Sequence, residues 1–417
     1  MECVEICGGK PLDGCVRIQG SKNAVLPMMA GCILHDGISR IEGCPRIRDV
    51  EDMVVLLAAL GCRVWWEGSC LTVDASDVNG WKLPREAASR MRSSVLFLGA
   101  LLGRMGKAEL PYPGGCVLGS RPVDLHIQAM RAMGAQIGEE KDCLMASASS
   151  LNGCEFCLRF PSVGATENLL LAAVTASGKT VIHNAAREPE IEQLCLFLTE
   201  KGARIRQKRA GTIEVEGVKR LHDSLHHLMP DRIVAGTYLI GAAVTGGRIE
   251  LERFPAEHMQ AVTETLAATG ISLQWTKDRL MADCRGERKG IDFLETAPYP
   301  GFPTDLQSPM VTLLSVSEGC CRVRENIFES RFKTVSQLQK MGAKIISDGK
   351  DILIEGTGQL HGAEVCAEEL RGAAALFLAG LNASGRTRIR GCCYAERGYE
   401  NICNDFRKLG AEIQIIE

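Results

Sequence analysis

Hydrophobic and polar positions repeat along this chain with a period of about seventy residues. A glycine followed by a small or apolar residue, a variable residue and an apolar residue recurs six times, at Gly61, Gly134, Gly202, Gly270, Gly342 and Gly410. The spacing before each glycine is that of an amphipathic helix, which a glycine can end in the left-handed conformation. The residues after it alternate as in a hairpin, for example over residues 344–354.

A second pattern repeats in phase with the first. Apolar helices about four turns long are predicted over residues 95–102, 165–176 and 373–381, among others, each followed by a glycine and a strand. These helices are apolar nearly all round, so they are expected to lie buried in the middle of a domain. Each unit is therefore predicted to be strand, amphipathic helix, strand, strand and buried helix, an α/β architecture.

The sixth copy reaches Glu417 after its first hairpin strand, and its other half is predicted near the opposite end of the chain, at residues 3–6 and 15–20. We therefore expect the two terminal segments to complete one unit together. Six units in two groups of three predict two domains, one over residues 22–229 and one over residues 230–417 plus 1–21.

Composition narrows the class of protein. The chain has 417 residues, of which 46% are hydrophobic and 24% charged, and its formal net charge is −3. This balance argues against a general nucleic-acid binder, which would carry a basic stripe. No export signal is apparent, and the most apolar window is far shorter than the ~20 residues of a membrane span. We expect a cytoplasmic protein that does not enter the membrane.

Nineteen cysteines invite a disulfide or metal interpretation. Their odd number, irregular spacing and the absence of an export signal favour reduced thiols instead. Cys154 and Cys157 form a single CxxC in a strand-like run, which we interpret as core packing rather than a zinc site. Most of the other cysteines are expected to be small buried apolar residues, and no metal site is predicted.

The predicted starts of the buried helices carry an unusual set of residues. Cations oppose the positive end of a helix dipole, so their presence there suggests that a negative ligand supplies the missing charge. The alternative is that they are surface cations or interdomain salt-bridge partners, and Asp305 alone could be a favourable charge at a helix start. The six starts read Lys22-Asn23, Arg92, Gly164-Ala165-Thr166, Asp231-Arg232, Thr304-Asp305 and Arg371.

Residues 111–126, PYPGGCVLGSRPVDLH, combine several glycines with a thiol and an arginine that could act on a ligand. Such a glycine-rich loop can approach a ligand closely and move. Cys116 is a candidate acid or nucleophile, and Arg121 can hold a carboxylate or phosphate. We interpret this stretch as a lid that closes over an anion.

These motifs resemble the UDP-N-acetylglucosamine 1-carboxyvinyltransferase family over essentially the whole chain. The resemblance implies an inside-out α/β barrel of two domains, each of three repeats around central helices. It implies transfer of the enolpyruvyl group of phosphoenolpyruvate to the 3-hydroxyl of UDP-N-acetylglucosamine, with release of phosphate, as the first committed step of peptidoglycan precursor synthesis. No cofactor is implied. The motifs are Gly20-Ser21-Lys22-Asn23, Met91-Arg92, Gly114-Gly115-Cys116, Ser120 to His126, Pro161 to Thr166, Arg187 to Glu190, Pro230-Asp231-Arg232, Phe302 to Gln307, Glu325 to Arg331, Arg371 and Arg397-Gly398.

The resemblance also implies residue roles. Cys116 would be the general acid toward the methylene carbon and the thiol that fosfomycin alkylates, and Asp305 would take the proton from the sugar hydroxyl. Lys22, Arg121 and Arg397 would hold phosphoenolpyruvate. The remaining substrate-binding set is Asn23, Arg92, Pro122, Val123, Asp124, Leu125, Ser162, Val163, Gly164, Ile327, Arg331 and Arg371.

Two positions depart from the family pattern. Phe160 stands where some members have lysine, and Tyr394 where many have histidine; Arg159 could compensate for the first. The nearest alternative is the sister transferase acting on shikimate 3-phosphate, which lacks the cysteine loop. An inactive paralogue or a purely structural repeat array would not need the complete set of cations and acid–base residues. The sequence leaves the oligomeric state open.

Overall fold

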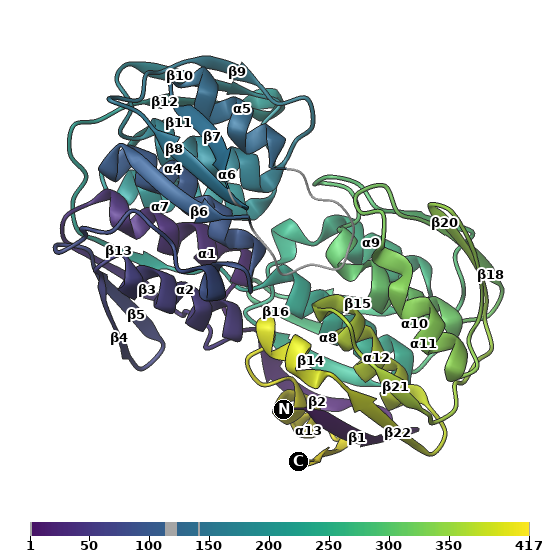
Figure 1. The fold of residues 1–417 in the computed structure, drawn as a ribbon. Coiled ribbons are helices and arrows are strands. Elements are labelled where there is room, and N and C mark those ends of the chain that lie inside the picture. The colour runs from purple at the N-terminus through teal and green to yellow at the C-terminus, as the bar shows by residue number, and fades with distance from the viewer. Residues whose placement is uncertain (1, 113–122, 141, 417) are drawn as a thin grey trace. The chain divides into compact units, whose positions relative to one another are not determined.

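The structure is a computed structural model, and it describes residues 2–112, 123–140 and 142–416, with only the backbone of Ala210. The chain divides into two compact units (Figure 1). Among the described residues, the middle unit takes in those from Gly20 to Met229, and the terminal unit combines those up to Gln19 with those from Pro230 onward. Each unit has its own hydrophobic core, one drawn from residues 24–229 and the other from residues 4–18 and 233–413.

Helices occupy the inside of the middle unit and sheets its outside (Figure 1). The most buried helices are α1 (Lys22–Gly31), α4 (Phe97–Met105) and α6 (Val163–Ala173). The amphipathic helices α2 (Arg48–Ala59), α5 (Asp124–Ala132) and α7 (Pro189–Glu200) pack against α1 or α6. The predicted α/β architecture with buried central helices is confirmed.

Three sheets of the described middle unit follow the repeat. Their strand orders are β13-β3-β5-β4, β6-β8-β7 and β11-β12-β10-β9. The long strands are antiparallel, and the short strands β9 and β13 join their sheets in parallel. The strands are β3 (Ile38–Glu42), β4 (Arg63–Glu67), β5 (Cys70–Asp74), β6 (Lys107–Pro111), β7 (Gln136–Glu140), β8 (Cys143–Ser147), β9 (Glu155–Cys157), β10 (Lys179–His183), β11 (Arg204–Lys208), β12 (Thr212–Glu216) and β13 (Ser224–His227).

The terminal unit repeats this plan. Its buried helices are α8 (Arg232–Thr245), α10 (Gln307–Ser315) and α12 (Leu370–Asn382). Its sheets have the orders β15-β16-β14-β2, β17-β18-β20-β19 and β21-β22-β1-β23. The other elements are β1 (Cys3–Cys7), β2 (Asp13–Arg17), β14 (Arg248–Glu252), α9 (Gln260–Ala268), β15 (Ser272–Trp275), β16 (Arg279–Asp283), β17 (Phe293–Glu295), β18 (Cys320–Arg324), α11 (Val335–Lys340), β19 (Lys344–Asp348), β20 (Asp351–Glu355), β21 (Glu364–Cys366), β22 (Arg386–Arg390), α13 (Ile402–Lys408) and β23 (Glu412–Ile416).

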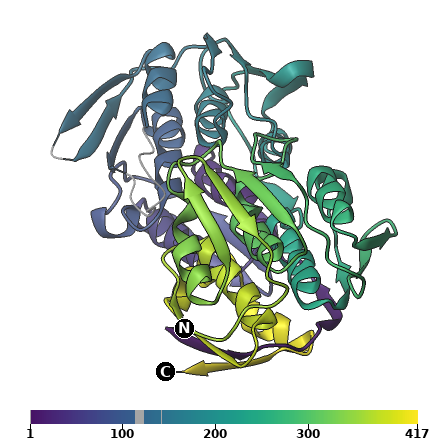
Figure 2. The ribbon, with the colours of Figure 1, turned by 90° about the vertical axis from the view of Figure 1, so that its right-hand side faces the viewer.

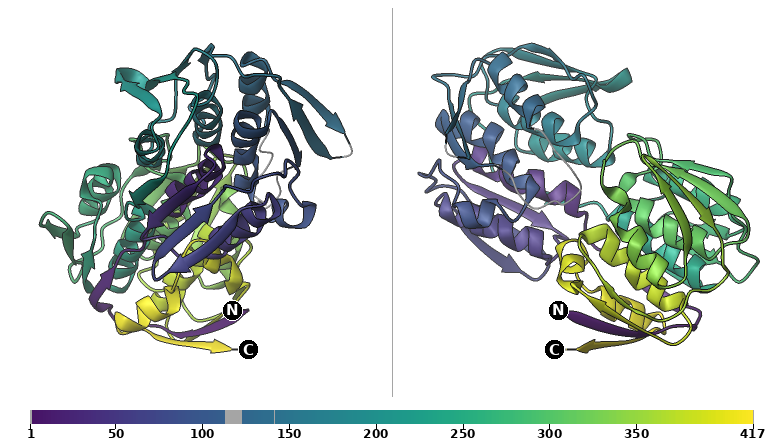
Figure 3. Two further views of the ribbon diagram at one scale, coloured as in Figure 1. Left: turned by 90° about the vertical axis from the view of Figure 1, so that its left-hand side faces the viewer. Right: turned by 45° about the vertical axis from the view of Figure 1, so that its right-hand side comes forward.

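The two ends of the chain share one sheet, as the repeat predicts. Strand β1 lies between β22 and β23 and is antiparallel to both, with Cys3 opposite Arg390 on one side and Ile416 on the other. The first and last strands run side by side in both views of Figure 3, and again in Figure 2. Because β1 is an inner strand of this sheet, its backbone groups are paired on both edges.

The six repeat glycines end amphipathic helices as predicted. Their φ angles lie between 90° and 101°, the left-handed region that only glycine adopts at little cost. The hairpin predicted over residues 344–354 is also present, as β19 and β20 with Asp348 opposite Asp351.

The cysteine predictions hold only in part. The half-buried Cys154 packs against the core of the middle unit, as predicted, whereas Cys157 is exposed, so the core-packing interpretation is wrong for Cys157. The reason is that Cys157 lies on the edge strand β9, whose one inward residue is the half-buried Phe156. Eight of the eighteen cysteines in the described chain are buried, which is fewer than expected. None of the described helices has the length and hydropathy to cross a membrane.

Candidate functional site

The central helices begin where the sequence predicts, and their first turns hold the predicted site residues. Lys22 opens α1, and Arg92 opens a 3-10 turn, Arg92–Leu96, that leads into α4. Asp305 lies in the 3-10 turn Thr304–Leu306 before α10, and Arg371 is the second residue of α12. Each residue is thus placed by the start of a buried helix.

Asp305 binds two buried arginines in the terminal unit. Its Oδ1 accepts a hydrogen bond from Nη2 of Arg331 at 2.6 Å, and its Oδ2 accepts one from Nη2 of Arg371 at 2.9 Å. The side chains of Arg331 and Arg371 are only 2% and 5% exposed, whereas that of Asp305 is 26% exposed. The arginines are therefore not surface cations, and the carboxylate between them reaches solvent.

Further groups fix the position of these arginines. Glu369 caps α12 by accepting hydrogen bonds from the backbone N–H groups of Arg371, at 2.7 Å, and Gly372, and its Oε2 lies 3.7 Å from Nη1 of Arg331. Arg331 also donates to the carbonyl oxygen of Thr304 from Nε at 3.2 Å and from Nη2 at 3.1 Å. Burial by itself would lower the pKa of Arg371, but Asp305 and other negative partners keep it above its usual value, so the side chain stays charged.

Glu325 holds the loop that contains Ile327. Its Oε1 accepts hydrogen bonds from the N–H groups of Ile327 at 2.8 Å and Phe328 at 3.1 Å, and its Oε2 accepts one from the hydroxyl of Thr304 at 3.0 Å. A buried carboxylate therefore ties the Ile327 loop to the turn that carries Asp305.

Arg397 lies in the terminal unit, at the end of the 3-10 turn Cys392–Arg397, which packs against α12. The residue after it is held by Gln19, whose Nε2 donates to the carbonyl oxygen of Gly398 at 3.1 Å. Tyr394 in the same turn is exposed.

Lys22 is the buried cation of the middle unit. Its Nζ lies 2.6 Å from Oδ2 of Asp49, and the two side chains are 11% and 3% exposed. Asp49 stands in the first turn of α2, so the ion pair joins two neighbouring helices. Asn23 follows Lys22 on α1, whose N-cap is Ser21.

The starts of α5 and α6 hold the predicted nucleotide-binding residues. Val123 precedes Asp124 and Leu125 at the start of α5, and Asp124 forms an ion pair with Arg159. Ser162 caps α6 by accepting a hydrogen bond from the N–H of Ala165 at 3.4 Å. The first residues of α6 are Val163 and Gly164. Phe160 is exposed, 43% of its surface being open to solvent.

The structure brings Asp305, Arg331 and Arg371 together, and it places Lys22, Asn23, Arg92, Val123, Asp124, Leu125, Ser162, Val163 and Gly164 at helix starts of the other unit. Cys116, Arg121 and Pro122 lie outside the described residues. Within those residues, no group of His, Cys, Asp and Glu side chains is arranged to hold a metal ion.

Sequence reasoning missed several partners of these residues. Asp49 pairs with the buried Lys22, and Glu369 lies beside the buried Arg331. Asn168 lies in the middle of an apolar helix and binds His126. A polar residue inside an otherwise apolar helical run was the available signal for Asn168. Asp49 and Glu369 gave no such signal, because acidic residues at helix starts are common.

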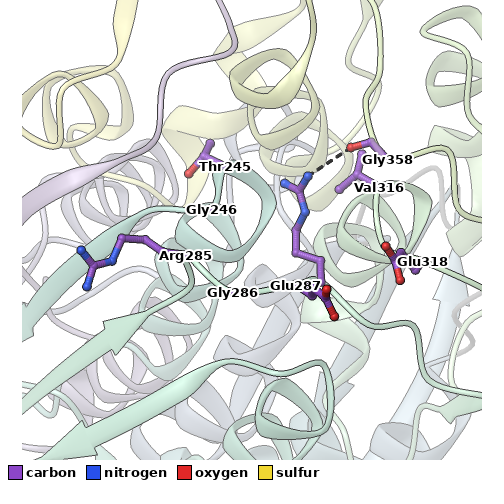
Figure 4. A pocket seen from close by; sticks show the side chains of 9 residues that line it. Thr245, Gly246, Arg285, Gly286, Glu287, Val316, Glu318 and Gly358 are labelled. Atoms are coloured by element: carbon purple, nitrogen blue, oxygen red, sulfur yellow. Dashed lines mark hydrogen bonds between the residues drawn. The ribbon is translucent and has the colours of Figure 1, made fainter.

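The terminal unit has a hollow of about 340 Å³ at the C-terminal ends of its central helices α8 and α10 (Figure 4). It is bordered by Thr245 at the end of α8, Val316 at the end of α10, and Glu318. Arg288 donates there to the carbonyl oxygens of Val244 at 2.5 Å and Gly358 at 3.2 Å. This arginine binds the C-terminal turn of α8 and the loop after β20, and it lies at the end of α8 opposite Arg232, so the hollow is not the predicted site.

Comparison with known proteins agrees with the fold. A family model described as EPSP synthase (3-phosphoshikimate 1-carboxyvinyltransferase) matches residues 6–406. UDP-N-acetylglucosamine 1-carboxyvinyltransferase 2 of Caldanaerobacter subterraneus subsp. tengcongensis is 44% identical over 409 residues, covering 98% of both chains. UDP-N-acetylglucosamine 1-carboxyvinyltransferase of Nitratidesulfovibrio vulgaris is 42% identical over 415 residues, covering 99% of both.

Solved structures give the same result. The enolpyruvyl transferase NikO from Streptomyces tendae superposes with a TM-score of 0.89 at 26% identity, covering 99% of this chain and 98% of that one. EPSP synthase from Acinetobacter baumannii has a TM-score of 0.76 at 18% identity over both whole chains, which shows the shared fold alone. The chain belongs to the enolpyruvyl transferase family that the EPSP synthase model describes, among its UDP-N-acetylglucosamine 1-carboxyvinyltransferase members.

Proposed function

We propose that this protein transfers the enolpyruvyl group of phosphoenolpyruvate to the 3-hydroxyl of UDP-N-acetylglucosamine and releases phosphate. The observation that carries the proposal is the Asp305 carboxylate, partly open to solvent and held by Arg331 and Arg371 at the start of a central helix. A carboxylate fixed in this way can accept a proton from a hydroxyl that attacks an activated carbon. The names of relatives 42–44% identical to this chain support the choice of both substrates.

Phosphoenolpyruvate carries a carboxylate and a phosphate, so its binding needs several cations. We assign this role to Lys22, Arg121 and Arg397, with Arg92 nearby. Lys22 supports the assignment because its ammonium is a buried cation at the start of a central helix, where the Asp49 carboxylate holds it in place. The positive ends of the central helices add to the attraction.

Cys116 is the proposed general acid that protonates the methylene carbon. As carbon gains the proton, the neighbouring carbon becomes electrophilic and the sugar oxygen adds to it while Asp305 takes the hydroxyl proton. Loss of phosphate and of a proton from the methyl group then regenerates the enol ether on the sugar. The glycine-rich lid would exclude water, which would otherwise compete with the sugar hydroxyl.

The nucleotide is assigned to Asn23, Arg121, Pro122, Val123, Asp124, Leu125, Ser162, Val163, Gly164 and Ile327. In this assignment the domain of residues 22–229 carries the Cys116 lid and most of the nucleotide site, and the domain of residues 230–417 plus 1–21 carries Asp305 and Arg397. Reduced cysteines and peptidoglycan precursor synthesis fit a cytoplasmic enzyme, which we also propose.

A phosphate-release assay tests the proposal directly. Phosphate is expected only when phosphoenolpyruvate and UDP-N-acetylglucosamine are both present, and not when either is left out or when shikimate 3-phosphate replaces the nucleotide sugar. Release with shikimate 3-phosphate would assign the chain to the sister reaction. Release with phosphoenolpyruvate alone would mean a hydrolase and would contradict the transfer.

Variants test the residue roles in the same assay. Cys116→Ala is expected to abolish product formation, and Asp305→Ala to abolish turnover while nucleotide binding persists. Asp305→Asn keeps the shape of the side chain and covers the case in which Asp305→Ala leaves two buried arginines unpaired and unfolds. Asp292→Ala, an exposed aspartate of the same unit, is the control and should keep full activity. Full turnover by the Cys116 and Asp305 variants would refute their roles.

Fosfomycin provides an independent test of the thiol. We expect a single covalent adduct on Cys116, because a thiol among cations is held nearer its reactive thiolate form. Mass spectrometry of the digested protein should find the adduct there and nowhere else, and an unmodified Cys116 would count against the proposed lid chemistry.

A further inference from the structure

The backbone that follows Arg397 is held by the side-chain amide of Gln19. Nε2 of Gln19 donates to the carbonyl oxygen of Gly398 at 3.1 Å, and its Oε1 accepts a hydrogen bond from the N–H of Glu400 at 2.8 Å. Because a carbonyl oxygen can only accept and a backbone N–H can only donate, the orientation of the amide is set. Both polar groups of this side chain therefore bind the segment directly after Arg397.

Tyr399 anchors the same segment from inside the terminal unit. It is 1% exposed, and its hydroxyl lies 2.8 Å from the hydroxyl of Thr237 and 3.5 Å from Nη1 of Arg371. Thr237 donates its own hydrogen to a backbone carbonyl of α8 at 2.8 Å, so Tyr399 donates to Thr237 and accepts from Arg371. Residues 398–400 are therefore fixed by two separate sets of hydrogen bonds.

Gly398 brings this segment against the start of α12. A methyl carbon placed on Gly398 would lie 2.9 Å from Cδ2 of Leu370, the first residue of α12, so the absence of a side chain permits this close approach. The next residue of that helix is Arg371, which binds Asp305. The segment held by Gln19 is thus packed against the helix start that fixes the proposed base.

We propose that Gln19 is a positioning residue for Arg397, because it holds the backbone from which the guanidinium reaches phosphoenolpyruvate. This inference rests on the proposed function, which assigns Arg397 to that substrate. Arg397 is the last residue of a 3-10 turn, so no helix continues beyond it to fix its backbone. A long side chain on a loosened backbone has more conformational freedom to lose on binding, and it therefore binds an anion more weakly.

A purely structural role for Gln19 would have different consequences. If its hydrogen bonds only stabilised the terminal unit, their loss would disturb Asp305 and the Ile327 loop as well, and both substrates would bind less well. If Gln19 acts through Arg397, only phosphoenolpyruvate should be affected. The two substrates therefore separate the two roles.

Steady-state kinetics of phosphate release by the whole protein test the inference. Gln19→Met keeps the length of the side chain and removes both hydrogen bonds, so KM for phosphoenolpyruvate should rise about tenfold, as for the loss of one or two net hydrogen bonds. KM for UDP-N-acetylglucosamine should not change. Gln337→Met is the matched control and should change neither KM, because Gln337 is a half-buried glutamine of the same unit whose Oε1 accepts from the N–H of Cys366 at 3.2 Å.

A combination with Arg397→Lys shows whether Gln19 acts through Arg397. Arg397→Lys keeps the charge but loses the planar fork, so it should itself raise KM for phosphoenolpyruvate. Gln19→Met should then raise this KM by a much smaller factor in the Arg397→Lys protein than in the unaltered one, because the group that it positions is gone. Equal factors in the two proteins would contradict the inference.

A second variant keeps the test decisive if Gln19→Met does not fold. Gln19→Glu keeps the shape of the side chain and the acceptor for the N–H of Glu400, but its carboxylate cannot donate to Gly398. KM for phosphoenolpyruvate should again rise, and KM for the nucleotide sugar should not.

Three results would overturn the inference. They are an unchanged KM for phosphoenolpyruvate in a folded Gln19 variant, an equal rise in KM for both substrates, and loss of folding in both Gln19 variants, which would mean that Gln19 supports the whole terminal unit. Absence of phosphate release by the unaltered protein with both substrates present would instead contradict the proposed function itself.

Discussion

Buried ionisable side chains in this protein differ in whether a partner balances them. Arg371 is charged because Asp305 lies beside it, and Lys22 has Asp49. Glu167 of α6, only 5% exposed, faces Glu190 and Glu188 instead. Burial, and next these two carboxylates, raise the pKa of Glu167 well above its usual value.

This difference predicts how stability depends on pH. In the unfolded chain Glu167 loses its proton near pH 4.5, but in the folded protein it keeps the proton to higher pH. The folded state then binds more protons, so the free energy of unfolding falls as pH rises above about 4.5 until the folded-state group has also ionised. Glu167→Gln removes this loss, and its stability relative to the unaltered protein should increase from pH 4.5 to pH 8 in urea denaturation.

Glu192→Gln is the control for Glu167→Gln, because Glu192 lies in the first turn of the neighbouring helix α7 and is exposed. Its effect on stability should be small and should not grow with pH. The difference in free energy of unfolding between Glu167→Gln and the unaltered protein could instead be the same at pH 5 and pH 8. That result would mean that Glu167 ionises normally in the folded protein.

At the scale of elements, each repeat ends its amphipathic helix with the same left-handed backbone conformation, at a glycine. Gly410 has φ 90° with no atom within 4 Å of the position a Cβ would take, whereas Gly138 in strand β7 has equally open space and an ordinary φ. This pair separates backbone strain from crowding. It allows the contribution of the left-handed conformation to be measured alone.

Gly410→Ala is expected to lower the free energy of unfolding by about 1–2 kcal/mol, the cost of the left-handed conformation for a residue with a Cβ. Gly138→Ala should change it by less than about 0.5 kcal/mol, as for an ordinary surface substitution. Chemical denaturation of both variants checks the prediction. Equal effects would show that strain at the helix end is not what requires glycine there.

Elements were predictable from the sequence where one residue dictates a local structure. The glycines gave the helix ends, and the apolar runs gave the central helices with Lys22, Arg92 and Arg371 in their first turns. Contacts between elements were not predictable. Pairs such as Lys22 with Asp49 depend on how helices pack, and the exposure of Cys157 depends on the edge position of β9, which no local pattern encodes.

For the whole molecule, the decisive fact is that residues near both ends of the chain build one sheet and one core. Residues 4–18 contribute to the same core as residues 233–413, while the core of the middle unit uses residues 24–229. No buried residue belongs to both cores in the described chain. A substitution that weakens the packing of β1 should therefore destabilise the terminal unit and leave the core of the middle unit intact.

Ile6→Ala tests this independence. Ile6 is fully buried in β1, so removing its outer carbons should lower the free energy of unfolding of the terminal unit by about 2–5 kcal/mol. Hydrogen exchange measured by mass spectrometry should show faster exchange in β22 and β23, which flank β1, and unchanged exchange in α1 and α6. Ile346→Ala, at a residue 69% exposed on β19, should alter neither. Loss of protection in α1 and α6 to the same extent would mean that the two cores unfold as one cooperative body.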